Sequence, residues 1–297
     1  MLTDVQVIIV SWNVRDLLRR CLRSVLLDCD SAIEQPAQQI ETRVTVVDSA
    51  STDGSADMVR SEFPQVELVV CDDNIGYVRA NNLVLKTLIA SGQRAESSAT
   101  PQEPPHFAWL LNPDTVVHPG AAKALAGFMA AHPRCGLCGP KLVNPDGTLQ
   151  HGAFALPGLT QLAIDTVPRL QARLRDTPLD GRYPAAKYDG PPFPVGTPLG
   201  AAMFARVEAI GQIGVLDEGY EMYSEEIDWA ARMHKASWEV WCVPQAVVTH
   251  VGGASSAQAS ERAERLKWQS RQRYFSKHYG WLKRTLALQM VPARFRT

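Results

Sequence analysis

The feature that most constrains the fold is a series of short apolar runs that alternate with helix-like segments. Val5–Val10, Val44–Val47, Val66–Cys71 and Phe107–Leu111 are such runs, rich in Val, Ile and Leu. Strands buried on both faces have this composition, and strands that alternate with helices along a chain form a parallel sheet. The sequence therefore predicts an α/β fold in which helices cover both faces of a mostly parallel central sheet.

Apolar residues at helical spacing fill the segments between these runs. Asp16–Leu27, Arg79–Ile89 and Gly120–His132 are predicted helices, and the capping cluster Ser51–Ser55 leads into another helix that ends at Phe63. In the second half of the chain we expect helices over Glu225–Lys235 and Ser260–Tyr279, and short strands over Glu239–Cys242 and Val247–Val251.

Two segments lack periodicity. Ser91–His106 is rich in Ser, Pro, Gln and Glu, and we expect a surface loop inserted before the fourth strand. Thr177–Pro198 carries many prolines and glycines and predicts a long loop. Because long loops in compact domains are often functional, we expect this second loop to act as a lid.

The composition excludes several kinds of partner. The formal net charge of the 297 residues is −1, so no overall positive field steers the chain toward nucleic acid. The sequence contains no run of about 18 or more apolar residues, so it predicts no membrane-spanning helix. The N-terminus lacks the basic start and long apolar core of a signal peptide, and we expect a cytoplasmic protein.

The segment from Glu261 to Thr297 departs from this balanced composition. It contains ten Lys and Arg residues but only two acidic residues, Glu261 and Glu264. Aromatic residues are interleaved with the basic ones. A basic segment of this kind can lie on an anionic membrane surface, here the inner face. The alternative is a solvated helix that packs on the domain through its aromatic face.

Carboxylates follow the predicted strands at the points where these end. Asp48 closes the second run, and Asp114 follows the fourth. In open α/β sheets ligands bind at the carboxyl ends of the strands, where Asp48 could accept a hydrogen bond from a ring N–H or a ribose hydroxyl. Asp114 could bind a divalent cation that also binds phosphate oxygens. An ordinary turn over Asn112–Asp114 is the alternative.

A second acidic group opens the predicted helix that begins at Glu225. Glu225, Glu226 and Asp228 are more carboxylates than capping of the helix dipole requires, so one could be a general base toward a hydroxyl. His250 ends a predicted strand and could complete a metal site beside Asp114. A structural histidine is the alternative.

Taken together, these segments resemble the inverting, family-two nucleotide-sugar glycosyltransferases of GT-A fold, especially the bacterial rhamnosyltransferase-like branch. The matching segments occur in the family's order over nearly residues 5–280. They are Val10–Asn13, Val47–Ser55, Asn74–Gly76 with Asn82, Leu111–Thr115, Gly139–Gly147, Gly200–Ala201, Glu225–Asp228 and His250–Gly253.

The resemblance implies a GT-A fold, with a Rossmann-like, mostly parallel sheet flanked by helices and an acceptor-side C-terminal portion. It implies a glycosyltransferase domain over residues 1–260. Residues 1–118 would be the nucleotide-sugar-binding half and residues 119–260 the acceptor and catalytic half. Residues 261–297 would form a basic, aromatic, helical tail.

The resemblance also implies a role for each site residue. Glu226 would be the base, at a position where the family usually has Asp, and the role moves to Glu225 if that side chain points inward. Asp228 belongs to the same acidic group. The other implied positions are Ser11, Asn13, Asp48, Asn74, Gly76 and Asn82 for the nucleoside, Asn112 in the DxD-like motif, Asp114 and His250 for Mg²⁺ or Mn²⁺, and Gly200 in the acceptor-side loop.

The implied donor is a nucleoside-diphosphate sugar. Deoxythymidine-linked rhamnose is favoured, and a uridine-linked hexose stays open. The implied acceptor is a hydroxyl of a saccharide or a lipid-linked sugar in cell-surface polysaccharide synthesis, and a second copy of the chain is a further candidate partner. A nucleotidyltransferase would need a glycine-rich phosphate loop, which Ser11–Asn13 lacks. A catalytically impaired nucleotide-sugar-binding protein is the other alternative.

Overall fold

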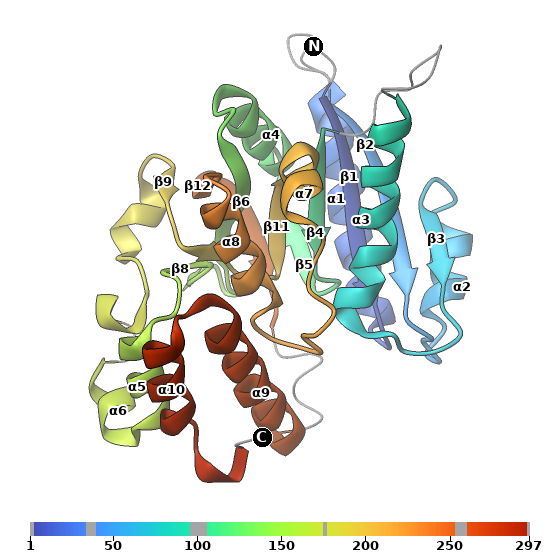
Figure 1. Ribbon diagram of the computed structural model, residues 1–297. Coiled ribbons are helices and arrows are strands. Elements are labelled where there is room, and N and C mark those ends of the chain that lie inside the picture. Colours follow the sequence, from blue (N-terminus) through green and yellow to red (C-terminus); the bar gives the residue numbers. More distant parts are fainter. Residues whose placement is uncertain (1–2, 34–39, 96–105, 175–176, 253–259, 296–297) are drawn as a thin grey trace.

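A computed structural model describes residues 3–33, 40–95, 106–174, 177–252 and 260–295 of the chain (Figure 1). Its core is a ten-stranded sheet, in which eight strands follow the order β3-β2-β1-β4-β11-β6-β12-β5. These strands are β1 (Thr3–Ser11), β2 (Ile40–Asp48), β3 (Glu67–Val70), β4 (Phe107–Leu111), β5 (Thr115–Val117), β6 (Cys135–Val143), β11 (Ala202–Arg206) and β12 (Glu239–His250). Short strands β7 (Leu149–Gln150) and β9 (Phe193–Pro194) pair with β6 and β12, and β8 (Ala153–Phe154) pairs with β10 (Thr197–Pro198).

The direction of the strands divides the sheet into two parts. Strands β3, β2, β1 and β4 are all parallel, and β6 is parallel to β12. Strand β11 lies between β4 and β6 and is antiparallel to both, and β5 is antiparallel to β12. The prediction of a mostly parallel central sheet is confirmed, and β11 joins its two parallel parts.

Helices cover both faces of the sheet (Figure 1). They are α1 (Arg15–Ile33), α2 (Ser55–Glu62), α3 (Gly76–Ala95), α4 (Ala121–Ala131), α5 (Leu159–Thr166), α6 (Pro168–Leu174), α7 (Val207–Ile213), α8 (Glu225–Lys235), α9 (Ser260–His278) and α10 (Trp281–Met290). Three short 3-10 helices are η1 (Pro178–Asp180), η2 (Ala185–Asp189) and η3 (Ala293–Phe295).

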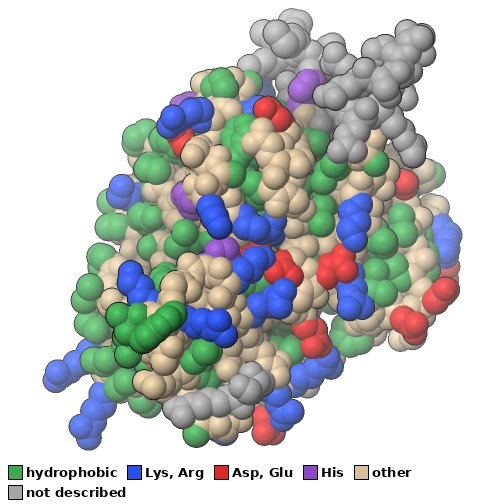
Figure 2. All heavy atoms as spheres, in the orientation of Figure 1, with side chains coloured by type: hydrophobic (Ala, Val, Ile, Leu, Met, Phe, Trp, Pro, Cys, Tyr) green, Lys and Arg blue, Asp and Glu red, His purple; other side chains and the backbone are tan. Residues whose placement is uncertain are grey.

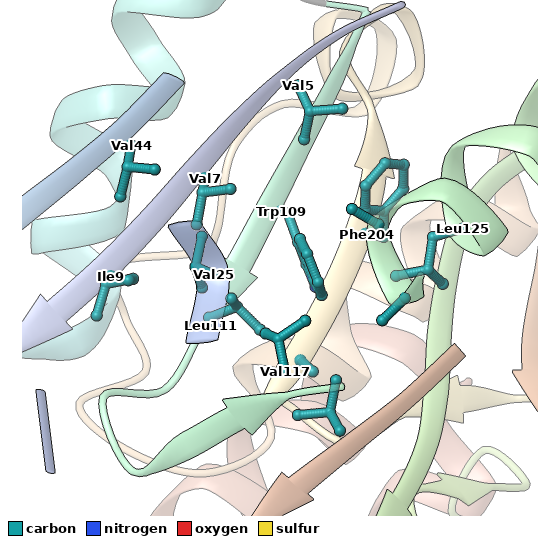
Figure 3. Packing of buried hydrophobic residues seen from close by; sticks show 14 of the residues in the cluster. Val5, Val7, Ile9, Val25, Val44, Trp109, Leu111, Val117, Leu125 and Phe204 are labelled. Carbon is teal, nitrogen blue, oxygen red and sulfur yellow. The ribbon is translucent and has the colours of Figure 1, made fainter. Parts of the chain in front are cut away.

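Successive residues of the central strands point to opposite faces, so each face has its own apolar core. Val7 and Ile9 of β1 pack with Trp109 and with residues of α1, α2 and α4, as Figure 3 shows in part. Ile8, between them in sequence, packs in a second core with residues of α3, α7 and α8. Burial on both faces explains why these strands are continuous apolar runs.

The second half of the chain agrees less well with the sequence-based elements. Strand β4 and helix α8 have the predicted bounds. The two short strands expected after α8 are one strand, β12, with an irregularity in its pairing between Val243 and Val247. Strands β6 and β11 and helices α5, α6, α7 and α10 were not predicted. Ser91–Ala95 ends α3, and residues 96–105 lie outside the described residues.

The segment Thr177–Pro198, predicted as a long loop that acts as a lid, contains only short elements and is packed on the domain. Tyr188 and Phe193 in this segment are buried in the second core. The Tyr188 hydroxyl lies 3.2 Å from both the backbone nitrogen and the carbonyl oxygen of Ala153. The aromatic residues therefore anchor the segment to the domain.

The last two helices pack against the helix that begins at Glu225. Trp268 and Phe275 of α9 and Ala287 of α10 are buried in a third apolar core, to which Leu162 of α5 and Ile227 of α8 contribute. No helix within the described residues is long and apolar enough to cross a membrane. The aromatic residues of α9 thus serve mainly to attach the C-terminal helices to the domain.

Many of the basic side chains of α9 are bound by acidic side chains elsewhere in the fold. Arg273 and Lys277 bind Asp217 at 2.8 and 2.6 Å, and Arg271 binds Asp165 at 3.0 Å. Figure 2 shows basic and acidic side chains gathered in the middle of this face. These ion pairs neutralise much of the positive charge of α9 within the protein. Arg296, also part of the predicted basic tail, lies outside the described residues.

Candidate active site

The carboxyl ends of β1 and β2 bring together two polar side chains, each with an oxygen atom that has no hydrogen-bond partner among the described residues. Ser11 and Asp48 are adjacent in the register of the two strands. Both are buried, and Ser11 Oγ and Asp48 Oδ2 have no hydrogen-bond partner, while Asp48 Oδ1 accepts from the Ser51 backbone N–H at 2.9 Å. Because an unpaired buried polar atom costs about 1–3 kcal/mol, these two atoms suit a bound polar ligand.

Side chains hold the loop after β1 to the loop after β2. Asn13, in the left-handed conformation with φ 53°, accepts a hydrogen bond from the Thr52 N–H at 2.7 Å, and its own N–H donates to Ser51 Oγ. Asp53 accepts from the Arg15 N–H at 2.8 Å. The loops that surround the Ser11–Asp48 pair are therefore fixed relative to each other before any ligand binds.

The turn after β3 places the start of α3 beside the same edge of the sheet. Asn74 Oδ1 accepts from the Gly76 N–H at 3.0 Å and from Ser49 Oγ at 3.3 Å. Gly76 has φ 77°, a conformation that residues with a side chain rarely adopt, and α3 begins there. Asn74 and Gly76 thus position the backbone of this turn next to Ser49, which follows Asp48.

Asn82 has a structural role in place of the expected contact with a nucleoside. It is fully buried, its Nδ2 donates to the Leu216 carbonyl at 2.9 Å, and its Oδ1 accepts from the Leu216 N–H at 3.1 Å. Nδ2 also contacts Glu218. Because both ends of the amide are occupied, Asn82 joins α3 to the loop after α7.

Replacing Asn82 by alanine should therefore destabilise the fold without changing nucleotide affinity. Asn82→Ala leaves the buried N–H and C=O of Leu216 unpaired, and we expect the free energy of unfolding to fall by about 2–4 kcal/mol. Urea unfolding and nucleotide titration would measure the two effects. Asn81→Ala, which removes one bond within α3, is the matched control. A selective loss of nucleotide affinity in Asn82→Ala would restore the original expectation.

A turn and a strand pairing bring Asp114 and His250 together. The chain turns over Asn112–Asp114 after β4, and the next residue, Thr115, pairs with His250 of β12. As a result, Asp114 Oδ1 lies 3.4 Å from His250 Nε2. Asp114 Oδ2 accepts from the Gly252 N–H at 3.1 Å, while Gly253 lies outside the described residues.

The second ring nitrogen of His250 determines the chemistry of this pair. His250 Nδ1 is 2.8 Å from Gln150 Oε1, and Gln150 Nε2 donates to Asn144 Oδ1 at 3.0 Å. Gln150 Oε1 is therefore an acceptor, and Nδ1 of His250 carries the proton. The lone pair of Nε2 then faces the Asp114 carboxylate, and a cation bound to both atoms would stabilise these two acceptors at 3.4 Å.

Asp114 and His250 are thus suitable protein ligands for a divalent cation. Carboxylate oxygen suits Mg²⁺ and Mn²⁺, and neutral imidazole is a common metal ligand. Among the described residues, no third His, Cys, Asp or Glu joins them to form a group of three. The remaining ligands of a cation here would be oxygen atoms of a substrate or of water.

Helix α8 presents two carboxylates at its first turn, of which Glu225 is buried and Glu226 is half-buried. Glu225 and Glu226 follow Ser224, which has φ 65°, and Oε2 of each glutamate is buried without a hydrogen-bond partner. A Cβ placed on Gly200 would lie 3.7 Å from Cβ of Glu226, so the Gly200 backbone packs against this side chain. The Tyr77 hydroxyl donates to the Gly200 carbonyl at 3.1 Å. The absence of a side chain at Gly200 leaves the Glu226 carboxylate room beside it.

Both glutamates hold protons more tightly than an exposed glutamate does. Burial, followed by the charge of Glu226, raises the pKa of Glu225 to about 8. Burial also raises the pKa of Glu226, and the positive charge of Arg271 partly opposes this shift. A carboxyl with a raised pKa is a stronger base once it is ionised, which suits removal of a proton from a hydroxyl.

The raised pKa of Glu225 predicts how the stability of the protein depends on pH. Because its pKa is about 8 in the folded state against 4.5 for an ordinary glutamate, folding binds a proton and stability falls as the pH rises between these values. Glu225→Gln cannot ionise, so it should raise the free energy of unfolding at about pH 8.5 by on the order of 1–3 kcal/mol.

Urea unfolding at several pH values would test this expectation. The difference between Glu225→Gln and the unmodified protein should shrink as the pH falls and become constant below 4.5, where Glu225 is protonated in both states. Glu208→Gln, on the exposed side of α7, is the control and should show no such trend. A constant difference at all pH values would contradict the raised pKa.

Asp228 does not belong with the two catalytic candidates. It is fully buried and binds Arg232 at 2.8 Å, Lys277 at 2.8 Å and His278 at 2.7 Å. Burial opposes its ionisation, but the hydrogen bonds from His278 and Lys277 outweigh this, and its pKa is lowered. Asp228 therefore attaches α8 to α9, which corrects the expectation of a catalytic role.

One backbone hydrogen bond connects the turn that carries Asp114, a candidate metal ligand, to the segment that packs against Glu226, the candidate base. The Asn112 N–H donates to the Ala201 carbonyl at 2.9 Å, and Ala201 follows Gly200, which packs against Glu226. The structure thus places the turn with Asp114 and the start of α8 around one region. Sequence reasoning missed Tyr77, Gln150 and Arg271, because no local pattern marks side chains whose partners are distant in the chain.

A sheet of this order, with polar loops at its carboxyl edge and helices on both faces, is the GT-A fold of nucleotide-sugar glycosyltransferases. The structure of GalNAc-T7 with UDP, GalNAc and Mn²⁺ has a TM-score of 0.58 at 13% identity, over 94% of this chain and 52% of that one. The mannosyltransferase PcManGT from Pyrobaculum calidifontis, in complex with GDP-Man and Mn²⁺, has a TM-score of 0.54 at 16% identity, over 98% and 66%. These similarities show the fold.

Sequence comparison then identifies the family. Residues 6–153 match the model of glycosyl transferase family 2. The N-acetylglucosaminyl-diphospho-decaprenol L-rhamnosyltransferase of Mycobacterium tuberculosis is 30% identical over 286 residues, which cover 94% of this chain and 87% of that protein. The chain belongs to glycosyl transferase family 2, and it is a glycosyltransferase.

Proposed function

We propose that this glycosyltransferase is a metal-dependent, inverting enzyme of cell-surface polysaccharide synthesis. It moves a sugar, rhamnose in the favoured case, from a nucleoside-diphosphate donor to a hydroxyl of a saccharide or lipid-linked acceptor. The observation that carries the proposal is the connection of Asp114 and His250, through the Asn112–Ala201 contact, to a glycine that packs against Glu226. Cation ligands and a base would thus act on one bound donor.

The proposed chemistry is a single displacement. Glu226 accepts the proton of the acceptor hydroxyl, whose oxygen forms a bond to the anomeric carbon. The bond between that carbon and the diphosphate oxygen breaks on the opposite side, so the anomeric configuration inverts. Mg²⁺ or Mn²⁺ bound by Asp114 and His250 would stabilise the negative charge of the diphosphate as a Lewis acid. Ser11 and Asp48 would hold the nucleoside, with Asn13, Asn74 and Gly76 shaping its pocket.

The choice of substrates is proposed from the mycobacterial relative. That protein is named as an L-rhamnosyltransferase of an N-acetylglucosaminyl-diphospho-decaprenol, and the similarity extends over almost the whole of both chains. We therefore favour a deoxythymidine-linked rhamnose donor and a diphosphate-linked lipid acceptor, with a uridine-linked hexose as the second donor. Residues 1–118 would bind the donor, residues 119–260 the acceptor, and a cytoplasmic location fits both substrates.

Release of nucleoside diphosphate from a panel of nucleotide sugars would test the proposal. The assay would compare Mg²⁺, Mn²⁺ and EDTA, with lipid-linked and simple sugar acceptors. We expect turnover with one donor that depends on both the cation and the acceptor. Tight donor binding without turnover on any acceptor would favour the impaired nucleotide-sugar-binding protein, and full activity in EDTA would contradict the role of the cation.

A further inference from the structure

Exposed hydrophobic side chains gather on one corner of the molecule. Eleven large hydrophobic residues are exposed among those the structure describes, and six belong to the segment that holds α5, α6 and η1 or to α10. Trp281 and Leu282, at the start of α10, are 72% and 62% exposed. The other four are Val167, Leu170, Leu179 and Leu286. Helix α5 contacts both α6 and α10, so these residues form one corner, at the lower left of Figure 1.

The same corner carries positive charge that its described acidic residues do not balance, because Asp165 of α5 binds Arg271 and Asp180 of η1 binds Arg182. Residues 166–174 and 281–290 contain Arg169, Arg173, Lys283 and Arg284 and no Asp or Glu. Figure 2 shows hydrophobic and basic side chains together over this part of the surface. Within the described residues, Arg169, Arg173 and Arg284 form no ion pair, in contrast to Arg271, Arg273 and Lys277 of α9. The combination of exposed Trp and Leu with free basic groups is typical of surfaces that lie in a membrane interface.

We propose that this corner, formed by α6 and α10, docks onto an anionic lipid bilayer. The apolar side chains would enter the interfacial region, and the arginines would bind lipid head groups, which supplies the two signals that stable peripheral binding requires. A second copy of the chain fits this surface less well, because a symmetric contact would bring the same arginines face to face. The proposed membrane-binding element is therefore the surface of α6 and α10, and not the whole basic segment Glu261–Thr297 considered from the sequence.

Docking through this corner would place the enzyme beside a lipid-linked acceptor. This consequence for catalysis rests on the proposed function. Ala287 of α10 and Leu162 of α5 share an apolar core with Ile227, the residue after Glu226. A bilayer bound to α6 and α10 would therefore lie beside the domain that carries the base. An acceptor whose lipid stays in the membrane would then present its sugar to an enzyme held at the same surface.

Flotation of the full-length protein with lipid vesicles tests the proposal. Vesicles would contain phosphatidylglycerol with phosphatidylcholine, or phosphatidylcholine alone, at low salt and at about 0.5 M NaCl. We expect binding to the anionic vesicles that salt weakens. Trp281→Ser with Leu282→Ser should reduce binding about tenfold or more, since two apolar side chains no longer enter the interface. Arg169→Ala with Arg284→Ala should reduce it about fivefold for each charge.

Matched controls separate docking from folding and from catalysis. Leu27→Ser, at an exposed leucine of α1, and Arg60→Ala, at an exposed arginine of α2, should leave binding unchanged. The docking variants should keep thermal stability and turnover with a soluble acceptor, and lose turnover only with the acceptor in vesicles. The proposal is overturned if they bind vesicles normally, or if they instead abolish self-association, which would make the corner a dimer interface. Failure of turnover with every donor would sink the proposed function but not the docking.

Discussion

Glu226→Gln is expected to lower the rate of sugar transfer by about 10²–10⁴-fold, the usual contribution of a general base. Glutamine has the same size as glutamate but cannot accept a proton from the attacking hydroxyl. It should fit the site, because Gly200 leaves room beside this side chain and its Oε2 has no partner to lose. Nucleotide affinity should remain, since the residues proposed for the nucleoside lie at the ends of β1 and β2.

Single-turnover transfer and nucleotide titration would measure these effects, with Glu225→Gln as the matched variant. We expect Glu225→Gln to retain most activity at a pH where Glu226 is ionised. Activity of the unmodified enzyme should fall as the pH drops through the pKa of Glu226, which burial raises above the ordinary glutamate range. If Glu225→Gln is the inactive variant and Glu226→Gln is active, the base is Glu225.

Asp114→Asn is expected to lower cation-stimulated turnover by about 10²–10³-fold, as loss of one element of charge stabilisation typically does. The asparagine keeps the shape of the side chain and its contact with the Gly252 N–H at 3.1 Å, but it removes the negative charge that faces His250. Titration of turnover with Mn²⁺, together with Mn²⁺ binding in the presence of nucleoside diphosphate, would separate loss of the cation from loss of chemistry.

Two further variants sharpen this test. Gln150→Leu removes the acceptor that fixes the proton on His250 Nδ1, and should weaken Mn²⁺ binding about 10–100-fold without abolishing turnover at saturating cation. Asp73→Asn, an exposed carboxylate after β3, is the control and should have no effect. Unchanged Mn²⁺ binding in Asp114→Asn would contradict the role of Asp114 as a cation ligand.

The parallel strands could be predicted because burial on both faces requires a continuous run of apolar, often branched residues, which is visible in the local sequence. Val5–Val10 and Phe107–Leu111 are recognisable in any window that contains them. Strand β11 lacks such a run, because its sequence contains Ala and Met in place of branched residues. Strand β6 contains Gly139, where a Cβ would lie 2.6 Å from Pro198, so the glycine serves a close contact that only the tertiary structure reveals. Helices α5 and α10 likewise depend on a core that they build together.

The candidate site shows the same division. Asp48, Asp114 and Glu226 could be chosen as candidates because they lie at the end of a strand, in the turn after a strand and at the start of a helix, respectively. The role of Asp228 could not, because it is decided by His278, 50 residues away. Asn82 was misassigned for a similar reason, since its partner Leu216 is 134 residues distant. Local patterns locate candidate carboxylates, but they do not distinguish ligands from structural polar groups.

The attachment of α8 to α9 has a consequence for the order in which this enzyme becomes competent during its synthesis. Domains form progressively as the chain leaves the ribosome, N-terminal parts first. Strands β1 and β2, which carry Ser11 and Asp48, lie within the first 118 residues, whereas Lys277 and His278, which bind Asp228, follow much later in the chain. A chain synthesised only as far as residue 118 would thus contain the residues proposed for the nucleoside, whereas the helix that bears Glu226 is secured only after residue 278 has been made.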